Sequence, residues 1–308
     1  MVTVGQRGTM EPMANLLRSR PNGPQRFREL MATADGPLLL PGCYDALGAR
    51  LIEQAGFDVV YMTGFGTSAS LLGRPDVGLL GLAEMVDNAR RIVDATDLPV
   101  IADADTGYGN QINVIRTVQA YERAGVAGIH LEDQVLPKKC GHMEGKVVLP
   151  RDEFVGKIEA AVAARQDSDF TIIARTDARA PHDVEEALAR ARAAHDAGAD
   201  VLFVEALQND EELKYVTDEL AGLPLVFNWA EGGKTPPLTY DQIASMGFSM
   251  IIMPISTLLA ATRAMQEALA QIKADGTPVT AVKSMPSFAD FTDGIGLPEI
   301  VDLELRFS

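Results

Sequence analysis

The chain has 308 residues and a formal net charge of −16, and 47% of its residues are hydrophobic. So acidic a protein lacks the basic face that binding to nucleic-acid phosphates requires, and no run of about 18 apolar residues predicts a membrane span. Its two cysteines, Cys43 and Cys140, form no disulfide framework and favour a cytoplasmic protein. An anionic substrate would need local cations, either Arg and Lys side chains or a metal ion.

Residues 1–24 are polar and lack the apolar middle stretch of a signal peptide, so we expect a mobile arm. From residue 25 onward, one sequence pattern recurs: a helical segment, a glycine and then an apolar run. Gly56, Gly125, Gly198 and Gly247 each stand where a helix should end. The runs that follow them are continuously apolar, which is typical of parallel strands covered on both faces.

Apolar runs predict eight strands, at residues 38–42, 58–62, 98–103, 127–132, 170–175, 200–205, 224–228 and 249–254. Helical patterns, such as those at 151–165 and 184–197, fill most gaps between them. This alternation predicts a (β/α)8 TIM barrel over residues 25–275. An open, doubly wound sheet is the alternative, but no Gly-x-Gly-x-x-Gly turn follows the first run.

Two segments depart from the repeat. The glycine-rich stretch 64–82 lies between the second and third strands, and we expect a mobile loop at the active site there. A long amphipathic helix over 256–272 follows the last strand, and residues 276–308 then carry apolar side chains that a closed barrel does not need. We expect a helical tail that packs on a neighbouring subunit; the alternative is a tail that folds back onto its own barrel.

Polar residues follow almost every predicted strand, and TIM barrels carry their chemistry at these C-terminal strand ends. The residues are Tyr44, Thr63, Asp103, Asp105, Glu132, Arg175, Glu205 and Asn228. Each one taken singly is compatible with a solvated strand end. Together they predict one pocket at the mouth of the barrel.

Acidic residues form the first group at this mouth. Asp103 and Asp105 are two residues apart on a strand, so both side chains should point to one face. Glu132 ends the next strand, and three carboxylates so close together need a cation, or protonation of one of them. Oxygen ligands without His or Cys favour magnesium, or manganese, over zinc. Asp76, in the 64–82 stretch, is a further candidate ligand, through water.

Cys140 lies in a loop that follows the fourth strand. Its neighbours Lys138, Lys139 and His142 argue against apolar burial and should lower the pKa of its thiol. Proton donor and nucleophile are both open roles for this thiol. No residue nearby completes an acyl-transfer triad, which favours proton transfer.

Arg175 is the cation at the end of the fifth strand. Its planar guanidinium is suited to two-pronged binding of a substrate carboxylate. The alternative is an ion pair with Glu205 that only holds the mouth of the barrel together.

Four motifs stand at these strand ends. They are Asp-Ala-Asp-Thr-Gly-Tyr-Gly at 103–109, Ile-His-Leu-Glu-Asp-Gln at 129–134, Lys-Lys-Cys-Gly-His at 138–142 with Gly145-Lys146, and Ala-Arg-Thr-Asp at 174–177. The set resembles the isocitrate lyase/phosphoenolpyruvate mutase superfamily, over residues 27–307. The resemblance implies a TIM barrel whose last helix is exchanged between subunits, in a dimer or a homotetramer. It also implies magnesium near Asp103, Asp105 and Glu132, held mostly through water.

The form of two motifs narrows the resemblance. The Lys-Lys-Cys-Gly-His loop is typical of the carbon–carbon lyase branch, because the phosphonate-forming mutases usually lack its cysteine. Residues 228–236 resemble the form found in 2,3-dimethylmalate lyase and petal-death protein more than that of 2-methylisocitrate lyases. The implied substrate is a small 2-hydroxy di- or tricarboxylate of the 2,3-dimethylmalate or 2-methylisocitrate type. Retro-aldol or retro-Claisen cleavage would yield an α-keto acid such as pyruvate and a second carboxylate.

The resemblance also suggests roles for the site residues. Arg175 and the amides near Thr63, Gly64 and Phe65 would hold the carboxylate beside the hydroxyl, and Tyr44 would remove the hydroxyl proton. His142 and Asn228 would stabilise the enediolate, which Cys140 would protonate, and Glu205 would belong to the catalytic set. Lys138 and Gly141 would contact the substrate when the loop 138–146 closes.

Two rival functions remain. One is oxaloacetate hydrolysis or decarboxylation, or phosphonomutase-type chemistry, on the same scaffold. The other is a barrel that binds a keto acid without catalysis. The second is disfavoured because every expected catalytic position is filled.

Overall fold

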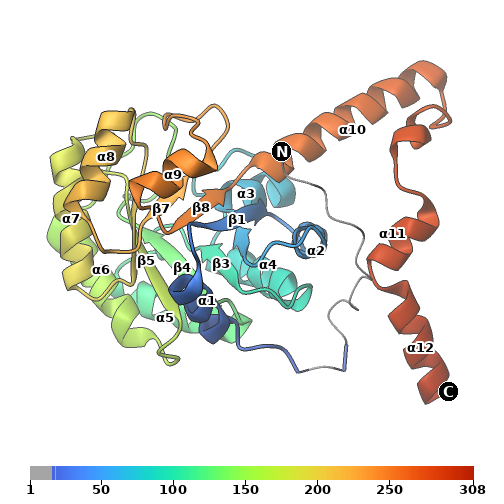
Figure 1. The fold of residues 1–308 in the computed structure, drawn as a ribbon, viewed down its shortest axis with the longest axis horizontal. Coiled ribbons are helices and arrows are strands. Elements are labelled where there is room, and N and C mark those ends of the chain that lie inside the picture. The colour runs from blue at the N-terminus through green and yellow to red at the C-terminus, as the bar shows by residue number, and fades with distance from the viewer. Residues whose placement is uncertain (1–15, 18) are drawn as a thin grey trace.

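The computed structural model describes residues 16, 17 and 19–308. Most of the predicted arm, residues 1–15 and 18, lies outside the described residues. In the described part, eight parallel strands follow one another around a barrel (Figure 1). They are β1 (Leu38–Cys43), β2 (Val60–Met62), β3 (Val100–Asp103), β4 (Gly128–Glu132), β5 (Thr171–Thr176), β6 (Val201–Val204), β7 (Val226–Asn228) and β8 (Met250–Met253). A parallel bridge from Leu202 to Leu225 joins β6 to β7 and closes the ring.

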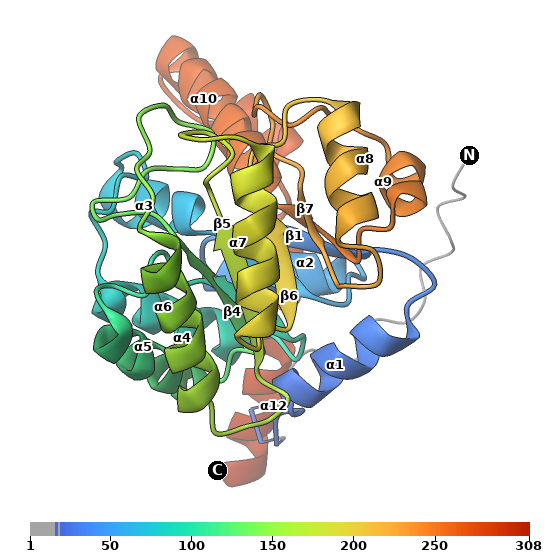
Figure 2. The same cartoon turned by 90° about the vertical axis from the view of Figure 1, so that its left-hand side faces the viewer.

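Helices surround this barrel, as Figure 2 shows from the side. They are α2 (Ala46–Gln54), α3 (Gly64–Leu72), α4 (Leu82–Asp94), α5 (Gln111–Ala124), α6 (Arg151–Ala164), α7 (Val184–Asp196), α8 (Asp210–Glu219) and α9 (Tyr240–Met246), with α1 (Gly23–Thr33) before β1. Polar side chains begin several of them; Asp183, for example, accepts a hydrogen bond from the Glu186 amide of α7. Left-handed glycines end others, including Gly125 after α5 and Gly247 after α9. The predicted TIM barrel is confirmed, with strand ends shifted by one or two residues.

The stretch 64–82 differs from the mobile loop that we expected. Its first half is the helix α3, in which the Thr63 side chain accepts a hydrogen bond from the Gly66 amide. Gly73, at φ 60°, ends the helix in the left-handed conformation. The glycines of this stretch therefore allow close packing and a helix stop, rather than a long irregular loop.

Two layers of apolar side chains fill the fold. The larger layer lies between the strands and the surrounding helices and includes Ile129, Phe154 and Phe227. The smaller one fills the inside of the barrel. Phe27, on α1, is fully buried and belongs to this inner layer, so α1 closes the barrel at the N-terminal ends of the strands.

We expect Phe27→Ala to lower the free energy of unfolding by about 3–5 kcal/mol, because it leaves a cavity in the inner layer. Urea denaturation measures this loss. Activity per folded molecule should be kept, because Phe27 lies at the end of the barrel opposite to the strand ends that carry the polar residues. A loss below about 1 kcal/mol would contradict the role of Phe27 as a plug.

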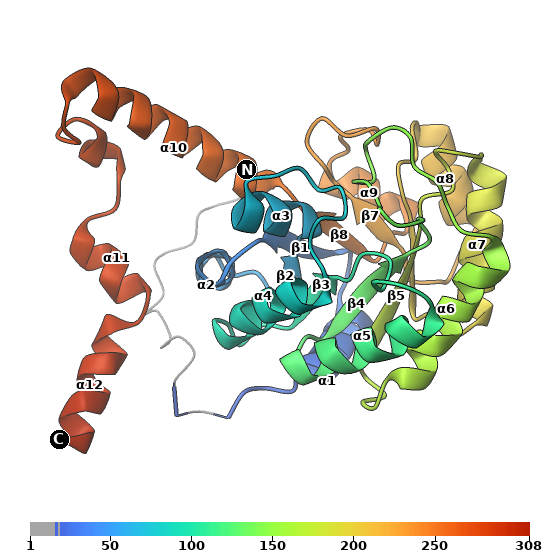
Figure 3. The ribbon, with the colours of Figure 1, turned by 180° about the vertical axis from the view of Figure 1, so that it is seen from behind.

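The C-terminal segment leaves the barrel. It consists of α10 (Ser256–Asp275), a short 3-10 turn (Ala281–Ser284), α11 (Phe288–Gly294) and α12 (Leu297–Phe307). Figures 1 and 3 show α11 and α12 standing apart from the barrel wall. The contacts back to the barrel include a hydrogen bond from the Gln54 side chain to the Gly294 carbonyl. Neither α10 nor any other helix of the described residues is long and apolar enough to cross a membrane.

Candidate active site

A cavity of about 240 Å³ opens at the C-terminal ends of the strands. Ten of the residues singled out from the sequence line it: Thr63, Phe65, Asp76, Asp103, Cys140, Gly141, His142, Arg175, Glu205 and Asn228. The thiol and part of the acidic group thus share one cavity. Its wall also contains apolar side chains, among them Met143, Ile252 and Ile255.

The acidic group is assembled by a turn as well as by the strands. Asp103 ends β3, but Asp105 lies beyond the strand with φ 48°, so the alternation expected from a strand does not apply to it. Instead, the Asp105 amide donates a hydrogen bond to Asp103 Oδ1, at 2.9 Å. The prediction that both residues share a strand face is therefore wrong, although their carboxylates do lie close together.

Lys138 reaches into the acidic group. Its buried ammonium lies 2.6 Å from Asp76 Oδ2 and 2.6 Å from Asp105 Oδ1. Lys138 does not line the cavity; it neutralises carboxylates that we had considered as metal ligands. We expected a cation among these carboxylates, and the ammonium of Lys138 supplies part of that positive charge.

Burial opposes ionisation of the carboxylates in this acidic group. It raises the pKa of Asp105 to about 7 and that of Glu132 well above its usual value. Burial also opposes ionisation of Asp103, but the charges of His130, Lys138 and Arg175 hold the pKa of Asp103 below its ordinary value. The charge of Lys138 therefore does not fully offset the burial of Asp105 and Glu132.

The donor set fits a hard divalent cation bound largely through water. Glu132 Oε1 is buried without a hydrogen-bond partner, and a cation or a water would satisfy it. Among residues 16, 17 and 19–308, no three His, Cys, Asp or Glu side chains are placed to ligate one ion directly. Oxygen donors with intervening water are what magnesium accepts.

Arg175 is shared among three carboxylates. Its Nε and Nη2 donate to the two oxygens of Asp177, at 2.9 and 3.1 Å. Glu132 Oε2 lies 3.4 Å from Nη1, and Glu205 Oε2 lies 3.5 Å from Nη2. The ion pair with Glu205 that we weighed as an alternative is present, although Arg175 also lines the cavity.

The loop that carries Cys140 is held to the barrel by hydrogen bonds of Lys146. The buried Lys146 ammonium hydrogen-bonds to the Gly141 carbonyl and to Asp177 Oδ1. A Cβ on Gly141 would lie 2.5 Å from Arg175 Nη2 and 2.6 Å from Glu205 Oε2, so only glycine allows the loop to approach this closely. Asp177 thereby ties both the loop and Arg175 to the end of β5.

Cys140 does not have the lowered pKa that its cationic neighbours predicted. Burial raises the pKa of this thiol to about 11, and the opposing effects of the His142 amide and of Arg175 are smaller. The ammonium of Lys138, two residues before Cys140, pairs with Asp76 and Asp105 rather than with the thiol. Cys140 is therefore protonated at neutral pH, as a proton donor must be and as a thiolate nucleophile is not.

Comparison with known proteins now bears on this site. The model of a protein family described as phosphoenolpyruvate phosphomutase matches residues 27–273. The chain belongs to this family.

One curated family member, 2,3-dimethylmalate lyase of Eubacterium barkeri, is 46% identical over 287 residues, which are 93% of this chain and 99% of that protein. A solved structure of oxaloacetate acetylhydrolase with the inhibitor 3,3-difluorooxalacetate superposes with a TM-score of 0.88 at 41% identity, and covers 92% of this chain and 97% of its own. Phosphonopyruvate hydrolase, solved with oxalate and Mg²⁺, has a TM-score of 0.84 at 31% identity, with coverages of 93% and 99%. The superfamily inferred from the four motifs is confirmed.

Five residues that the sequence assigned to the site do not line the cavity: Tyr44, Gly64, Asp105, Glu132 and Lys138. Tyr44 does not line the cavity, and burial, then Asp45, raises its pKa, which makes it a weaker acid than an ordinary phenol. Gly64 stands at the start of α3, where a Cβ would lie 2.3 Å from Asp103 Oδ2. Gly64 is thus needed for the close approach of the helix to Asp103.

Some site residues escaped sequence reasoning. Tyr61 lines the cavity, and its hydroxyl lies 2.7 Å from Nε2 of the buried His130. Lys146 and Asp177 stood inside the recognised motifs, yet nothing in their spacing indicated that they bond to each other. For Tyr61, the polar tip of an otherwise apolar strand was the available signal.

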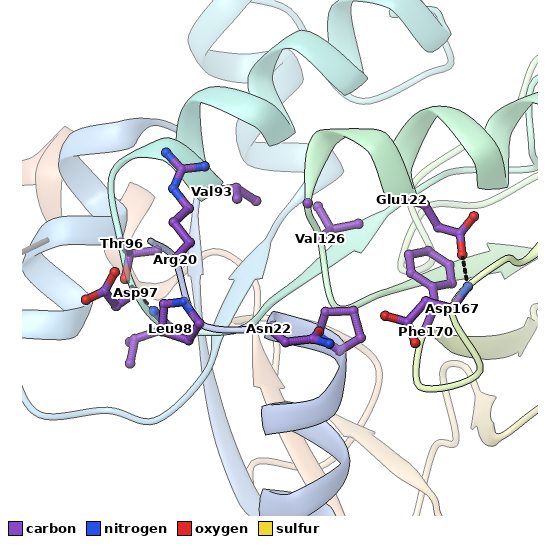
Figure 4. Close-up of a pocket in the computed structure, with 14 residues that line it drawn as sticks. Arg20, Asn22, Val93, Thr96, Asp97, Leu98, Glu122, Val126, Asp167 and Phe170 are labelled. Atoms are coloured by element: carbon purple, nitrogen blue, oxygen red, sulfur yellow. Dashed lines mark hydrogen bonds between the residues drawn. The ribbon is translucent and has the colours of Figure 1, made fainter. Parts of the chain in front are cut away.

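A second cavity, of about 270 Å³, lies at the N-terminal end of the barrel (Figure 4). Its charged side chains have partners: Arg20 lies 2.6 Å from Asp94, and Glu122 accepts a hydrogen bond from the Asp167 amide. TIM-barrel enzymes place their chemistry at the opposite end. The cavity with Cys140 is therefore the candidate active site.

Proposed function

We propose that this protein is a carbon–carbon lyase that cleaves a small 2-hydroxy dicarboxylate into an α-keto acid, such as pyruvate, and a second carboxylate. The observation that carries this proposal is that the Cys140 thiol lines the same cavity as Arg175, Asp76 and Asp103. A half-buried thiol with a raised pKa is a proton donor, and cleavage of a carbon–carbon bond beside a carboxylate leaves a carbanionic product that needs one. The identity to 2,3-dimethylmalate lyase supports the same chemistry.

The lining of the cavity supports a methylated diacid as substrate. Phe65, Met143 and Ile252 supply an apolar wall on which methyl groups can pack. Arg175 and the start of α3, with the amides near Thr63, supply the positive end for a carboxylate. A 2,3-dimethylmalate-type acid suits such a mixed wall, and a 2-methylisocitrate-type tricarboxylate remains within the class.

We propose that the cofactor is Mg²⁺, with Mn²⁺ as a substitute, near Asp76, Asp103, Asp105 and Glu132. Arg175 is already neutralised by Asp177 and Glu205, so a doubly charged substrate needs further positive charge. The Mg²⁺ found with oxalate in phosphonopyruvate hydrolase supports this choice. When bound, the ion would supply Lewis-acid stabilisation of the oxygens that gain negative charge.

The chain's own residues then divide the work. Arg175 orients one carboxylate, and His142 and Asn228, on the same wall, donate hydrogen bonds to the product that gains charge. Cys140 delivers its proton to that product. The loop 138–146, held down by Lys146, excludes water from the cavity. Tyr44 is the proposed base for the hydroxyl proton, in its phenolate form, although it does not line the cavity and burial raises its pKa.

A coupled assay tests the proposal. 2,3-Dimethylmalate, 2-methylisocitrate and oxaloacetate are each incubated with the enzyme and Mg²⁺, and keto-acid or oxalate release is followed. We expect Mg²⁺-dependent pyruvate release from a hydroxy diacid and its loss on chelation with EDTA. Oxalate release from oxaloacetate alone would favour the chemistry of oxaloacetate acetylhydrolase, whose fold matches closely. Turnover of none of these acids would contradict the lyase assignment.

We also propose that the tail 276–308 packs on a neighbouring subunit, in a dimer or a homotetramer, and that the protein acts in the cytoplasm. Phe288, Leu305 and Phe307 are 84%, 74% and 69% exposed, which is unusual for apolar side chains of an isolated molecule. A partner barrel would cover them. Light scattering of the full chain and of a chain ending at residue 276 compares the two oligomeric states.

A further inference from the structure

The loop after β7 contacts the ring of His142. The backbone amide of Lys234 lies 3.1 Å from His142 Nδ1. A backbone N–H can only donate, so Nδ1 must accept this hydrogen bond with a lone pair. The contact joins the segment 228–234 to the loop of Cys140, which comes from a different part of the barrel.

A second donor competes for the same ring. Asn228 Nδ2 lies 3.3 Å from His142 Nε2, but a neutral imidazole has only one nitrogen that accepts. Asn228 already donates to Glu205 Oε2, at 2.9 Å, and its side chain can turn, whereas the Lys234 amide has a fixed direction. The backbone contact therefore decides the tautomer, and the proton of the neutral ring resides on Nε2.

Nε2 faces the functional side of the ring. It lies 3.8 Å from Glu205 Oε1, and His142 lines the cavity together with Glu205 and Asn228. A proton on Nε2 makes His142 a hydrogen-bond donor toward this side. In the other tautomer, Nε2 would present a lone pair to a carboxylate, and the two would repel each other.

The chain leaves room for this contact at one residue. A Cβ on Gly233 would lie 2.8 Å from His142 Cε1 and 2.9 Å from Nδ1, and the Ala230 carbonyl lies 3.0 Å away on the other side. Any side chain there would push the ring off the Lys234 amide. Gly233 is thus required by the ring of a residue 91 positions earlier in the chain.

We infer that the Lys234 backbone amide, with the space left by Gly233, is a positioning group that holds His142 as its Nε2–H tautomer. His142 then meets a ligand in the cavity as a donor. The tautomer follows from the geometry alone, whereas its use in catalysis rests on the proposed function.

The side chain of Lys234 has a different role from its backbone amide and contributes less. It forms an ion pair with Glu144, whose side chain is 86% exposed. Surface pairs of this kind contribute little. Lys234→Ala keeps the backbone amide and removes only this pair, so it serves as the matched control for Gly233→Ala.

Nitrogen-15 NMR of the full-length protein with labelled histidine tests the inference, at a pH of about 8.5, where ordinary imidazoles are neutral. In a neutral imidazole, the nitrogen that carries the proton has a different nitrogen-15 chemical shift from the nitrogen that carries the lone pair. The spectrum therefore shows whether Nδ1 or Nε2 is protonated. The chain has four histidines, and the signals lost in His142→Gln identify His142. We expect Nε2–H in the wild type and in Lys234→Ala, and a mixture of tautomers in Gly233→Ala.

Kinetics complete the test. We expect kcat of Gly233→Ala to fall on the order of 100-fold with little change in KM, because a misplaced donor acts on the transition state. Nδ1–H in the wild type, or an unchanged tautomer in Gly233→Ala, would overturn the inference. If Gly233→Ala does not fold, Lys234→Pro removes the same N–H, and the wild-type spectrum still decides. A wild type with Nε2–H but no turnover of any diacid would refute the proposed function alone.

Discussion

Cys140→Ser is expected to lower kcat by about 10²–10⁴-fold while leaving Mg²⁺ binding intact. A serine hydroxyl is a far weaker acid than a thiol, so the carbanionic product would wait for a proton. Steady-state rates of pyruvate release measure the first effect, and calorimetric titration with Mg²⁺ measures the second. Turnover by Cys140→Ser at the wild-type rate would remove Cys140 from the proton-donor role.

Cys43 provides the matched control for this substitution. It is the other free cysteine of the chain, fully buried at the end of β1, and it does not line the cavity. Cys43→Ala should therefore keep kcat and alter only the stability of the fold. An equal loss of activity in both variants would indicate damage to the barrel rather than loss of a proton donor.

The raised pKa of Cys140 adds a pH dependence. With a pKa of about 11, the thiol stays protonated through the neutral and mildly alkaline range, so the step that depends on it should not weaken there. The same shift affects stability: because the folded-state pKa lies above the ordinary 9.0, its contribution is complete below pH 9.0 and is lost as the pH rises toward about 11. A pH profile of kcat that falls with a pKa well below 9 would contradict a thiol donor with a raised pKa.

The fold was predictable because its signals are local and repeated. A glycine stands at four of the helix ends, and a continuous apolar run marks each strand; both signals depend on backbone conformation and burial alone. The motifs placed Asp103 and Arg175 at strand ends and Cys140 in the loop after a strand, where the barrel brings them together. Once the barrel architecture was predicted, one common cavity followed from the positions of these residues.

The electrostatics of the site could not be read in the same way. The spacing of Lys138 and Cys140 suggested a cation next to a thiol, but the ammonium turns toward Asp76 and Asp105, and burial dominates the pKa of the thiol. The spacing of Asp103 and Asp105 suggested that both lie on one face of a strand, but the strand ends at Asp103 and the backbone turns at Asp105. Pairings between distant residues depend on which rotamers the packed site allows, and no local pattern records them.

Replacement of Arg175 should have the other large effect, because its single charge serves three buried carboxylates. We expect Arg175→Lys to lower kcat/KM on the order of 100-fold, since a point charge cannot contact Asp177 with two nitrogens and still reach Glu132 and Glu205. Arg175→Met should in addition lower the free energy of unfolding by about 3–5 kcal/mol, because it leaves buried carboxylates without a partner. Steady-state kinetics and urea denaturation measure the two losses.

Arg165 separates damage to the site from damage to the barrel. It pairs with Asp200 at 2.7 Å and bonds to the Phe170 carbonyl, at the opposite end of β5 from Arg175. Arg165→Met should lower stability while kcat/KM per folded molecule stays near that of the wild type. If Arg175→Lys keeps its kcat/KM, the arginine serves only to hold the strand ends together, and the positive end of the substrate site must be sought at the start of α3 and in the metal ion. If it loses kcat/KM without losing stability, the two-pronged geometry of Arg175, and not its charge, is what the substrate carboxylate requires.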